Sequence, residues 1–293
     1  MTIFNLGSIN ADYFYDVPHL PNPGETLAAT GFRKGLGGKG ANQSVAAARA
    51  GSSVVHIGSV GKDGRWAVER IKEFGVDVAN IAIIEVPTGH AIINIDKQAE
   101  NAIVIFQGAN VEQDKERILH ALSGAKRGDI LLLQNETSLQ RFTAAKAVEL
   151  GMRVFYSAAP FSVEKTRETL PFLSVLALNE IEAEQLCAEL ETNLEDLPVP
   201  NVLVTKGGEG SEWRTHATGG IVKTRAFDIS AVDTTGAGDT FAGYLAAGLD
   251  QRMEIGEALK LASAAAAIKV TRYGTADAIP CRGEVENFLA LRA

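Results

Sequence analysis

An acidic residue and two glycines stand together where an apolar helix should begin, within residues 234–241 (TTGAGDTF). The first N–H groups of a helix lack internal partners and carry partial positive charge, and glycine lets an anion approach them closely. Asp239 would suit the helix dipole but would repel a phosphate bound there. The arrangement indicates a phosphotransferase site in which the backbone around Gly236 and Gly238 holds a phosphoryl group while Asp239 faces the attacking hydroxyl. A first-turn acid with glycines for tight packing fits this segment equally well.

A second glycine-rich segment, residues 37–42 (GGKGAN), precedes an alanine-rich helical segment and also offers backbone donors. Gly38 and Asn42 are four residues apart and therefore share a helix face, and Lys39 adds a positive charge. Residues 35–40 also match G-x-G-x-x-G, but no buried strand is expected directly before them, which argues against a dinucleotide site. A Walker loop is excluded because Gly-Lys-Ser/Thr does not occur at the required spacing. The structural alternative is a surface turn with an exposed lysine.

Polar residues follow several apolar strands, at the edge where open α/β sheets bind ligands. Asn10 and Asp12 suit the binding of sugar hydroxyls, although such pairs more often form Asx turns, and Glu136 follows another strand. Asn179 and Glu182, three apart on one helix face, suit an outer-shell magnesium and phosphate position, with a solvated acidic helix as the commoner alternative. A turn that could hold a nucleotide, or be a simple hairpin, comprises Thr205, Lys206, Gly207, Gly208, Glu209 and Gly210.

The elements that must position these residues alternate between short apolar strands and helices, which predicts a mostly parallel sheet covered on both faces, a three-layer α/β/α fold. Gly51, Gly75 and Gly151 are placed to end three of the helices. We expect strands at residues 3–6, 54–59, 130–134, 153–157, 175–178 and 201–205, and helices at residues 41–50, 66–74, 139–150, 180–191, 240–249 and 255–271.

Two stretches, about 11–36 and 88–107, interrupt this alternation and are expected to form strands without intervening helices. The second is predicted to form a hairpin, with strands at residues 90–95 and 102–106 around a turn at 96–101. A small antiparallel sheet built from both stretches would form a lid whose apolar face covers a ligand or a second subunit. The chain is therefore expected to be one domain, 1–293, with a strand-built lid.

The overall composition is that of a globular protein without nucleic-acid or membrane partners. The net charge is −8, with no Lys/Arg run, and 46% of the residues are apolar. Cys187 and Cys281 are far apart and lack metal-ligand spacing, which favours reduced thiols. The N-terminus lacks signal-peptide features, and no apolar run reaches the roughly 18 residues of a membrane span. We therefore expect a soluble, cytoplasmic protein.

With these motifs in hand, the chain resembles the ribokinase family of carbohydrate kinases, which has the PfkB-type fold, nearly from end to end. The two glycine-rich motifs are specific to this superfamily, and GGKGAN together with Asn10 and Asp12 favours its ribose kinases. The segments that carry the resemblance are residues 7–12 (GSINAD), 23–26 (PGET), 37–42 (GGKGAN), 108–110 (GAN), 179–184 (NEIEAE), 232–234 (VDT) and 238–241 (GDTF).

The resemblance implies an ATP- and Mg²⁺-dependent transfer of phosphate to the primary hydroxyl of a small sugar, most closely O5 of D-ribose. Asp239 would accept the hydroxyl proton, and the backbone of Gly236, Ala237 and Gly238 would form the anion hole. Glu182 would contribute to the outer shell of Mg²⁺. The residues implied in sugar binding are Asn10, Asp12, Gly38, Lys39, Asn42, Glu136 and Asp239, and those flanking ATP are Asn179, Thr205, Lys206, Gly207, Gly208, Glu209, Gly210, Gly238 and Ser263.

The family resemblance also implies activation by K⁺ beside the anion hole and a homodimer formed through the lid. Ala278 lacks the hydroxyl expected near K⁺, and Ser263 stands where His or Asn is often found near the adenine, so cation dependence and nucleotide preference stay open. The positions implied in K⁺ binding, several through main-chain carbonyls, are Asp233, Thr235, Lys269, Arg272, Gly274 and Ala278.

Three alternatives remain beside ribose phosphorylation. The acceptor could be deoxyribose, another pentose or hexose, or a nucleoside. A non-catalytic sugar-binding protein is less favoured, because a pure binder has no need of Asp239 as a base. A nicotinamide-dependent oxidoreductase rests only on the G-x-G-x-x-G match at residues 35–40.

Overall fold

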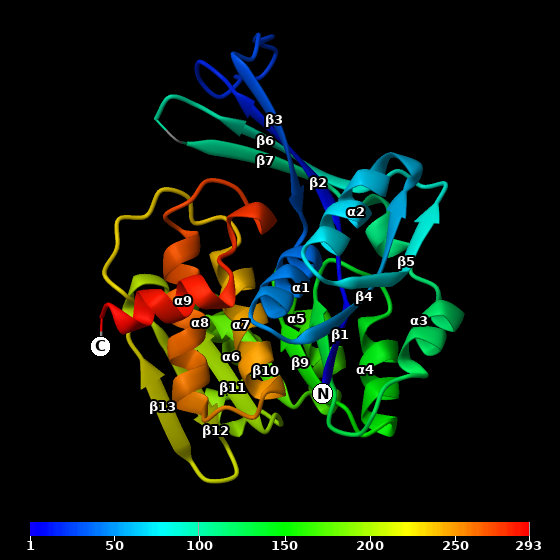
Figure 1. Ribbon diagram of the computed structural model, residues 1–293, viewed down its shortest axis with the longest axis vertical. Helices are drawn as coiled ribbons and strands as arrows, with labels where there is room; N and C mark the ends of the chain where they lie inside the picture. Colours follow the sequence, from blue (N-terminus) through cyan, green and yellow to red (C-terminus); the bar gives the residue numbers. More distant parts are fainter. Residues whose placement is uncertain (99, 293) are drawn as a thin grey trace.

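The computed structural model describes residues 1–98 and 100–292, so residue 99 of the expected turn and residue 293 of the expected domain lie outside the description. Two sheets are flanked by helices (Figure 1). The strands are β1 (Thr2–Leu6), β2 (Asn10–Asp16), β3 (Gly31–Gly37), β4 (Ser53–Gly61), β5 (Asp77–Ile84), β6 (Gly89–Ile95), β7 (Asn101–Phe106), β8 (Ile130–Gln134), β9 (Arg153–Ser157), β10 (Val175–Asn179), β11 (Asn201–Thr205), β12 (Ser211–Thr215) and β13 (Gly220–Thr224).

The larger sheet has the strand order β13-β12-β11-β10-β9-β8-β1-β4-β5. All pairs from β11 to β5 are parallel, and β12 and β13 add an antiparallel edge. The apolar run of β8 is buried on both faces, as a central parallel strand requires. The expected mostly parallel sheet, with strands at the six predicted places, is confirmed.

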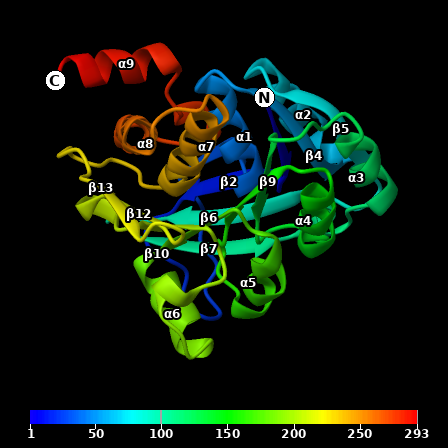
Figure 2. The ribbon, with the colours of Figure 1, turned by 90° about the horizontal axis from the view of Figure 1, so that it is seen from below.

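Helices cover both faces of this sheet and enclose two separate apolar cores. One core lies under α1, α2, α7, α8 and α9, and the other under α3, α4, α5 and α6; Figure 2 shows α7, α8 and α9 on the opposite side from α4, α5 and α6. Gly51, Gly75 and Gly151 have positive φ after three helices, as predicted. The helices are α1 (Lys39–Arg49), α2 (Arg65–Glu73), α3 (Lys115–Leu122), α4 (Gln140–Glu149), α5 (Val163–Thr169), α6 (Glu180–Glu189), α7 (Ala237–Asp250), α8 (Ile255–Lys269) and α9 (Arg282–Ala290).

None of the helices in the described ranges combines the length and apolar character that crossing a lipid bilayer requires.

The smaller sheet projects from the body and has the order β3-β2-β6-β7 (Figure 1). The expectation of an antiparallel sheet is wrong in one respect, because β2 pairs with β6 in parallel. Both strands leave the parallel central sheet in the same direction, β2 after β1 and β6 after β5, so they meet in parallel. Residues 31–37 form β3, and the exposure of residues 32–34 agrees with the expectation that no buried strand directly precedes the glycine-rich segment. We call this sheet the lid sheet.

Close backbone contact places α1 against both β1 and α7. A Cβ atom on Gly40 would lie 2.3 Å from the Cα of Gly7, and a Cβ atom on Gly243 would lie 2.5 Å from the Cβ of Ala46. Such separations are far below van der Waals contact, so only glycine fits at these positions. The missing side chains bring the N-terminal turns of α1 and α7 together at the carboxyl end of β1.

A buried histidine on β4 anchors the first turns of α1 from below. His56 is fully buried; its Nε2 lies 3.1 Å from the carbonyl oxygen of Gly7, which can only accept, so Nδ1 accepts from the Ser44 hydroxyl at 2.8 Å. Asn5 donates its amide to Ser44 and to the Gly40 carbonyl, both at 2.8 Å. Burial lowers the pKa of His56 from 6.5 to about 4, so the ring is neutral at pH 7.

This burial predicts a loss of stability in mild acid. The unfolded chain binds a proton at His56 below about pH 6.5, whereas the folded chain does so only near pH 4, so the free energy of unfolding should fall as pH decreases between these values. The contribution is on the order of 3 kcal/mol. Denaturant unfolding from pH 7 to pH 4 should show a smaller fall for His56→Gln, which does not titrate. Parallel pH dependences of the two proteins would contradict this account.

Candidate functional site

The N-terminal turn of α1 is closed by a carboxylate from the end of β8. Glu136 Oε2 accepts from the Lys39 N–H at 3.0 Å and from the Ser8 hydroxyl, and Ser8 Oγ accepts from the Gly40 N–H at 3.1 Å. A negative charge at a helix N-terminus is favourable. Gly38, with φ 90°, makes the turn possible, because a Cβ atom there would lie 2.8 Å from the Ser8 carbonyl oxygen. The loops after β1 and β8 are thereby joined to α1.

The N-terminal turn of α7 leaves backbone donors free. Gly236 has φ 74° and lies directly before the helix, and a Cβ atom on Gly238 would meet no atom within 4 Å. Within residues 1–98 and 100–292, the N–H groups of Gly236, Gly238 and Asp239 have no hydrogen-bond acceptor, whereas the Ala237 N–H donates to the Thr234 carbonyl at 3.1 Å. We call these three N–H groups the cradle. The sequence predicted the backbone of Gly236, Ala237 and Gly238 as an anion hole, and of these the Ala237 N–H is already engaged.

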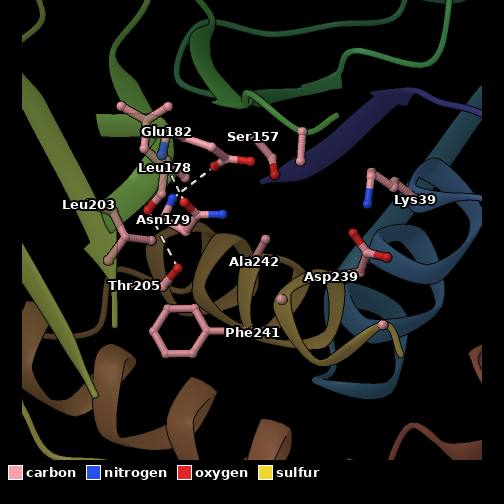
Figure 3. A pocket seen from close by; sticks show the side chains of 14 residues that line it. Lys39, Ser157, Leu178, Asn179, Glu182, Leu203, Thr205, Asp239, Phe241 and Ala242 are labelled. Carbon is pink, nitrogen blue, oxygen red and sulfur yellow. Dashed lines mark hydrogen bonds between the residues drawn. The ribbon is translucent and has the colours of Figure 1, made fainter. Parts of the chain in front are cut away.

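Asp239 lies in the first turn of α7, beside this cradle, and both of its carboxylate oxygens are held by amides of α1. Asn42 Nδ2 donates to Oδ2 at 3.0 Å, and Gln43 Nε2 donates to Oδ1 at 3.1 Å. The carboxylate is 7% exposed and lines a cavity of about 160 Å³ together with Lys39. Figure 3 shows the side chains of Lys39 and Asp239 pointing toward each other on one side of the group of lining residues.

The orientation of the Gln43 amide follows from a buried chain of amides behind it. The Gly40 carbonyl can only accept, so Asn5 must direct its Nδ2 toward it and its Oδ1 toward Gln134. Gln134 then uses both hydrogens of Nε2, one for Asn5 and one for Gln43 Oε1 at 2.8 Å. Gln43 is left with only its Nε2 to present to Asp239. The unpartnered, buried Oε1 of Gln134 is the cost of this fixed direction.

Three carboxylates and one lysine share this site. Burial, and then the charges of Glu136 and Asp239, raise the pKa of Asp12 from 3.8 to about 7, whereas Lys39 opposes this rise. Asp239 is the largest cause of a raised pKa at Lys39. The lysine is thus held in its charged form between carboxylates, and Asp12 is the carboxyl whose charge is most readily lost.

The lid sheet closes the site from above. Asn110, in the short helix η2 (Gly108–Val111) after β7, donates to Asn10 Oδ1 at 2.8 Å and accepts from the Ile9 N–H at 2.8 Å. A cavity of about 250 Å³ is lined by Asn10, Asn110, Glu136 and, from the lid side, Ile105 and Gln107. Asp12 and Ile105 both flank Ala91 in the strand pairing, so they lie on the same face of the lid sheet. That face covers the polar residues.

A third cavity, of about 370 Å³, lies on the other side of the cradle. It shares Thr205, Gly238 and Phe241 with the Asp239 cavity. Its walls are mostly apolar, with backbone approach at the glycines of the turn after β11. Its other lining residues are Gly207, Gly208, Gly210, Ala226, Phe227, Ile229, Ala231, Thr234, Ala237, Ser263, Ala266, Ala267 and Val270.

The structure brings most of the predicted residues to one edge of the central sheet, but not all. Lys206 pairs with Glu180 at 3.2 Å, and Glu209 is exposed; neither lines the 370 Å³ cavity, although the glycines between them do. Asn179 and Glu182 line the Asp239 cavity and cap α6 reciprocally, since each side chain accepts from the other's backbone N–H at 2.8 Å. Glu182 therefore caps α6 as well as lining this cavity.

The residues implied in K⁺ binding surround the loop before α7. Asp233 accepts from the N–H groups of Thr235 and Gly274, both at 2.9 Å. Lys269 donates its buried ammonium group to the Asp233 carbonyl at 2.8 Å. Arg272 turns away to pair with Glu284 at 2.6 Å, and Ala278 is buried in a short helix nearby. Lys269 is implied in K⁺ binding, where several positions act through their main-chain carbonyls. In the structure its side chain also lies in this region.

Sequence reasoning missed four side chains that connect the site. Ser8, Gln43 and Gln134 each lie within or next to a segment already singled out, but a glutamine on an apolar helix face or at a strand end carries no periodic signal that tells a buried amide from an exposed one. The sequence singles out Asn110 only as part of the GAN segment and assigns it no role in the site. Its separation from Asn10 along the chain hides their contact.

Comparisons with known proteins match nearly the whole length of the chain to carbohydrate kinases. A family model described as "pfkB family carbohydrate kinase" matches residues 2–282. The chain is 34% identical to a ribokinase of Haemophilus influenzae, with 98% of each chain covered, and 32% identical to a deoxyribokinase of Salmonella typhi, with 99% of each covered. It is also similar to the crystal structure of a ribokinase from Thermotoga maritima, with a TM-score of 0.88, 34% identity and 99% of each chain covered.

The electrostatics of the site predict how Asp12 titrates. Its carboxyl carbon, followed by ¹³C NMR, should titrate near pH 7 in the native protein. Glu136→Gln should lower this pKa by removing a neighbouring negative charge, and Lys39→Met should raise it by removing the opposing positive charge. Asp16→Asn, on the same strand but half exposed, serves as a control that leaves it unchanged. An Asp12 titration near pH 4 in the native protein would refute this assignment.

Proposed function

Because the chain belongs to the pfkB family of carbohydrate kinases, we propose that it transfers the γ-phosphoryl group of ATP to the primary hydroxyl of D-ribose, with Asp239 as the base. The single observation that carries this proposal is the position of Asp239 beside unpartnered N–H groups at the start of α7, in a cavity between the lid-covered chamber and the 370 Å³ cavity. A nucleotide and a sugar placed in these two spaces would meet at this carboxylate.

The sugar is assigned to the chamber beneath the lid sheet. Asn10, Asn110 and Glu136 line it, and Asp12 lies on the same face of the lid sheet as Ile105, which also lines it. Asn42 is buried next to Asp239. No donor among the described residues reaches the buried Asn42 Oδ1, which leaves an acceptor for a substrate hydroxyl. Covering this chamber with the lid sheet would exclude water, and so limit wasteful hydrolysis of ATP.

ATP is assigned to the 370 Å³ cavity. Its apolar walls, among them Phe227, Ala266 and Val270, suit the faces of an adenine ring, and Ser263 offers one polar contact. The phosphates would then extend past Gly238 to the free N–H groups at the start of α7, where partial positive charge favours them.

The proposed step is an in-line displacement. The O5 oxygen of ribose attacks the γ-phosphorus, the bond to the bridging oxygen of ADP breaks, and the hydroxyl proton passes to the Asp239 carboxylate. Asn42 and Gln43 each donate one hydrogen bond to a different oxygen of that carboxylate and hold it in place. Each carboxylate oxygen keeps a second lone pair that can accept the proton. The N–H groups of Gly236, Gly238 and Asp239, with Lys39, would stabilise negative charge on the transferred group.

The family implies Mg²⁺ as well as ATP, and the site offers a place for it. Within the described ranges, no group of three or more His, Cys, Asp and Glu side chains is placed to hold a metal ion. Magnesium in kinase sites is usually held by one or two carboxylates, phosphates and water. Glu182 fits this requirement, because only its Oε2 is engaged in capping α6. When bound, Mg²⁺ supplies charge neutralisation for the phosphates.

Potassium is a different case. The side chain of Lys269 already places a positive charge against Asp233, so the residues present do not fit the K⁺ that the resemblance implies. The proposed reaction therefore includes ATP and Mg²⁺ alone.

Two further features belong to the same proposal. The lid sheet carries exposed apolar side chains, among them Phe32, Val104 and Phe106, which would be covered in a homodimer formed through the lid. The free thiols of Cys187 and Cys281 suit a reducing compartment, so we place the enzyme in the cytoplasm.

The acceptor is tested with a panel of ribose, deoxyribose, other pentoses and hexoses, and nucleosides, each with ATP·Mg²⁺ and with ADP release as the readout. Ribose should give the highest kcat/KM. A preference for deoxyribose, the substrate named for one relative, would change the acceptor but keep the reaction. Sugar binding without ADP release from any acceptor would instead support the non-catalytic alternative.

Removal of the base is the most direct test of the mechanism. Asp239→Asn keeps the shape of the side chain but cannot accept the proton, so kcat should fall by at least ~100-fold while the affinity for ribose changes much less. Steady-state kinetics and equilibrium binding of ribose measure the two effects separately. A kcat near that of the native enzyme would remove Asp239 from the role of base.

The amide chain behind Asp239 predicts a coupled effect. Gln43→Met removes the donor to Asp239 Oδ1 and should lower kcat by about 10-fold, the size of one misplaced hydrogen bond, with little change in the KM for ribose. In the Asp239→Asn background, the same change should have almost no further effect. Ser52→Ala is a matched control, because it removes a donor from buried Asp250 at the far end of α7. Equal effects of Gln43→Met in both backgrounds would contradict the coupling.

A further inference from the structure

Lys269 is a fully buried lysine at the C-terminal end of α8, next to the loop that leads into α7. Its ammonium group donates to the main-chain carbonyl of Asp233 at 2.8 Å and lies 3.8 Å from the Asp233 carboxylate. Lysine is almost never fully buried unless it is paired, because removing its charge from water is costly. A buried charge at this place therefore requires a reason, and its partners supply one.

Asp233 is the centre of a small network that ties two loops together. One carboxylate oxygen accepts from the Thr235 N–H and the other from the Gly274 N–H, both at 2.9 Å. These contacts hold the carboxylate in its charged form and lower the pKa of Asp233 against the opposing effect of burial. Burial lowers the pKa of Lys269, whereas the charges of Asp233 and Asp239 oppose this shift. The lysine thus interacts electrostatically with Asp239 as well.

Several of the oxygens that a monovalent cation would need, those of Asp233 and the carbonyl of Lys269, are already engaged in this network. The Asp233 carbonyl accepts from the Lys269 ammonium, and the Lys269 carbonyl accepts from the Arg272 N–H at 3.0 Å. Ala278 has no side-chain oxygen. A K⁺ ion here would also lie within a few ångströms of a buried positive charge, where repulsion is strong. The site accommodates one cation, and the chain itself provides it.

We infer that the Lys269 ammonium group takes the place of the activating monovalent cation, so that phosphoryl transfer by this protein does not require K⁺. Lys269 is a positioning residue. It holds the Asp233 carbonyl, and with it the 233–236 loop that presents the N–H groups of Gly236, Gly238 and Asp239. It also adds a fixed positive charge beneath that loop. This inference rests on the proposed kinase function.

The native protein provides the first test, because it needs no substitution. Activity with ribose and ATP·Mg²⁺ is measured in NaCl and in KCl at the same ionic strength, so that general screening is constant. The two rates should agree within about two-fold, a difference of less than 1 kcal/mol in the barrier. Stimulation of the native enzyme by K⁺ of ten-fold or more would overturn the inference.

Truncation of the lysine should convert the protein into a cation-dependent enzyme. In Lys269→Ala, kcat in NaCl should fall by about 10-fold or more, and KCl or NH₄Cl should restore most of the loss by supplying a cation to the vacated space. Lys269→Met removes the charge but keeps the volume, so its loss should not be restored. Lys260→Ala, an exposed lysine of the same helix, should behave like the native protein. A Lys269→Ala variant with native kcat in NaCl, or with a loss that neither salt restores, would overturn the inference.

A second measurement does not depend on activity. The Tm of Lys269→Ala should be higher in KCl than in NaCl of equal ionic strength, because a ligand that binds only the folded chain stabilises it. The Tm of the native protein and of Lys269→Met should not distinguish the two salts. A Tm of the native protein that rises with K⁺ would count against the built-in cation. Failure of the native protein to release ADP with any acceptor would overturn the proposed function instead, while the Tm comparison would still test the cation.

Discussion

The close approach of α1 to β1 and α7 is the constraint on which the rest of the structure depends. Gly40 lies against Gly7 and Gly243 lies against Ala46 at separations that no other residue allows. This contact places the amides of α1 within hydrogen-bond distance of Asp239, although the two helices are formed by distant parts of the chain. Without it, the two helix N-termini would not face the same space.

The charged groups where α1, α7 and β1 meet are held in place by contacts within the protein itself. Glu136 occupies the N-terminus of α1, whereas the N-terminus of α7 keeps donors free, so only the second can receive an anion. Lys39 lies between the carboxylates of the site, and Lys269 lies below the loop that leads to α7. The two lysines neutralise different parts of this acidic region. Lys39 faces the Asp239 cavity, and Lys269 faces the backbone at Asp233.

The sequence predicted the architecture well because its signals are local. Apolar runs, glycine stops and the interruption of strand–helix alternation marked the central sheet and the lid strands, and all of them are observed. The parallel pairing of β2 with β6 could not be predicted locally, because it depends on where both strands leave the body. For Lys269, the sequence indicated the correct loop but not the direction of the side chain. The residues around Lys269 in the sequence do not show whether its ammonium group is buried or exposed. Only its contact with Asp233 in the folded chain decides this.

The course of β2 has a mechanical consequence. This strand begins at Asn10, carries Asp12, and lies in the lid sheet along its whole length, with only three residues separating it from the end of β1. Because Asp12 is paired on both sides within the lid sheet, a displacement of its backbone would be passed on to β3 and β6. The carboxylate expected to bind the sugar and the sheet expected to cover it are thus parts of the same strand.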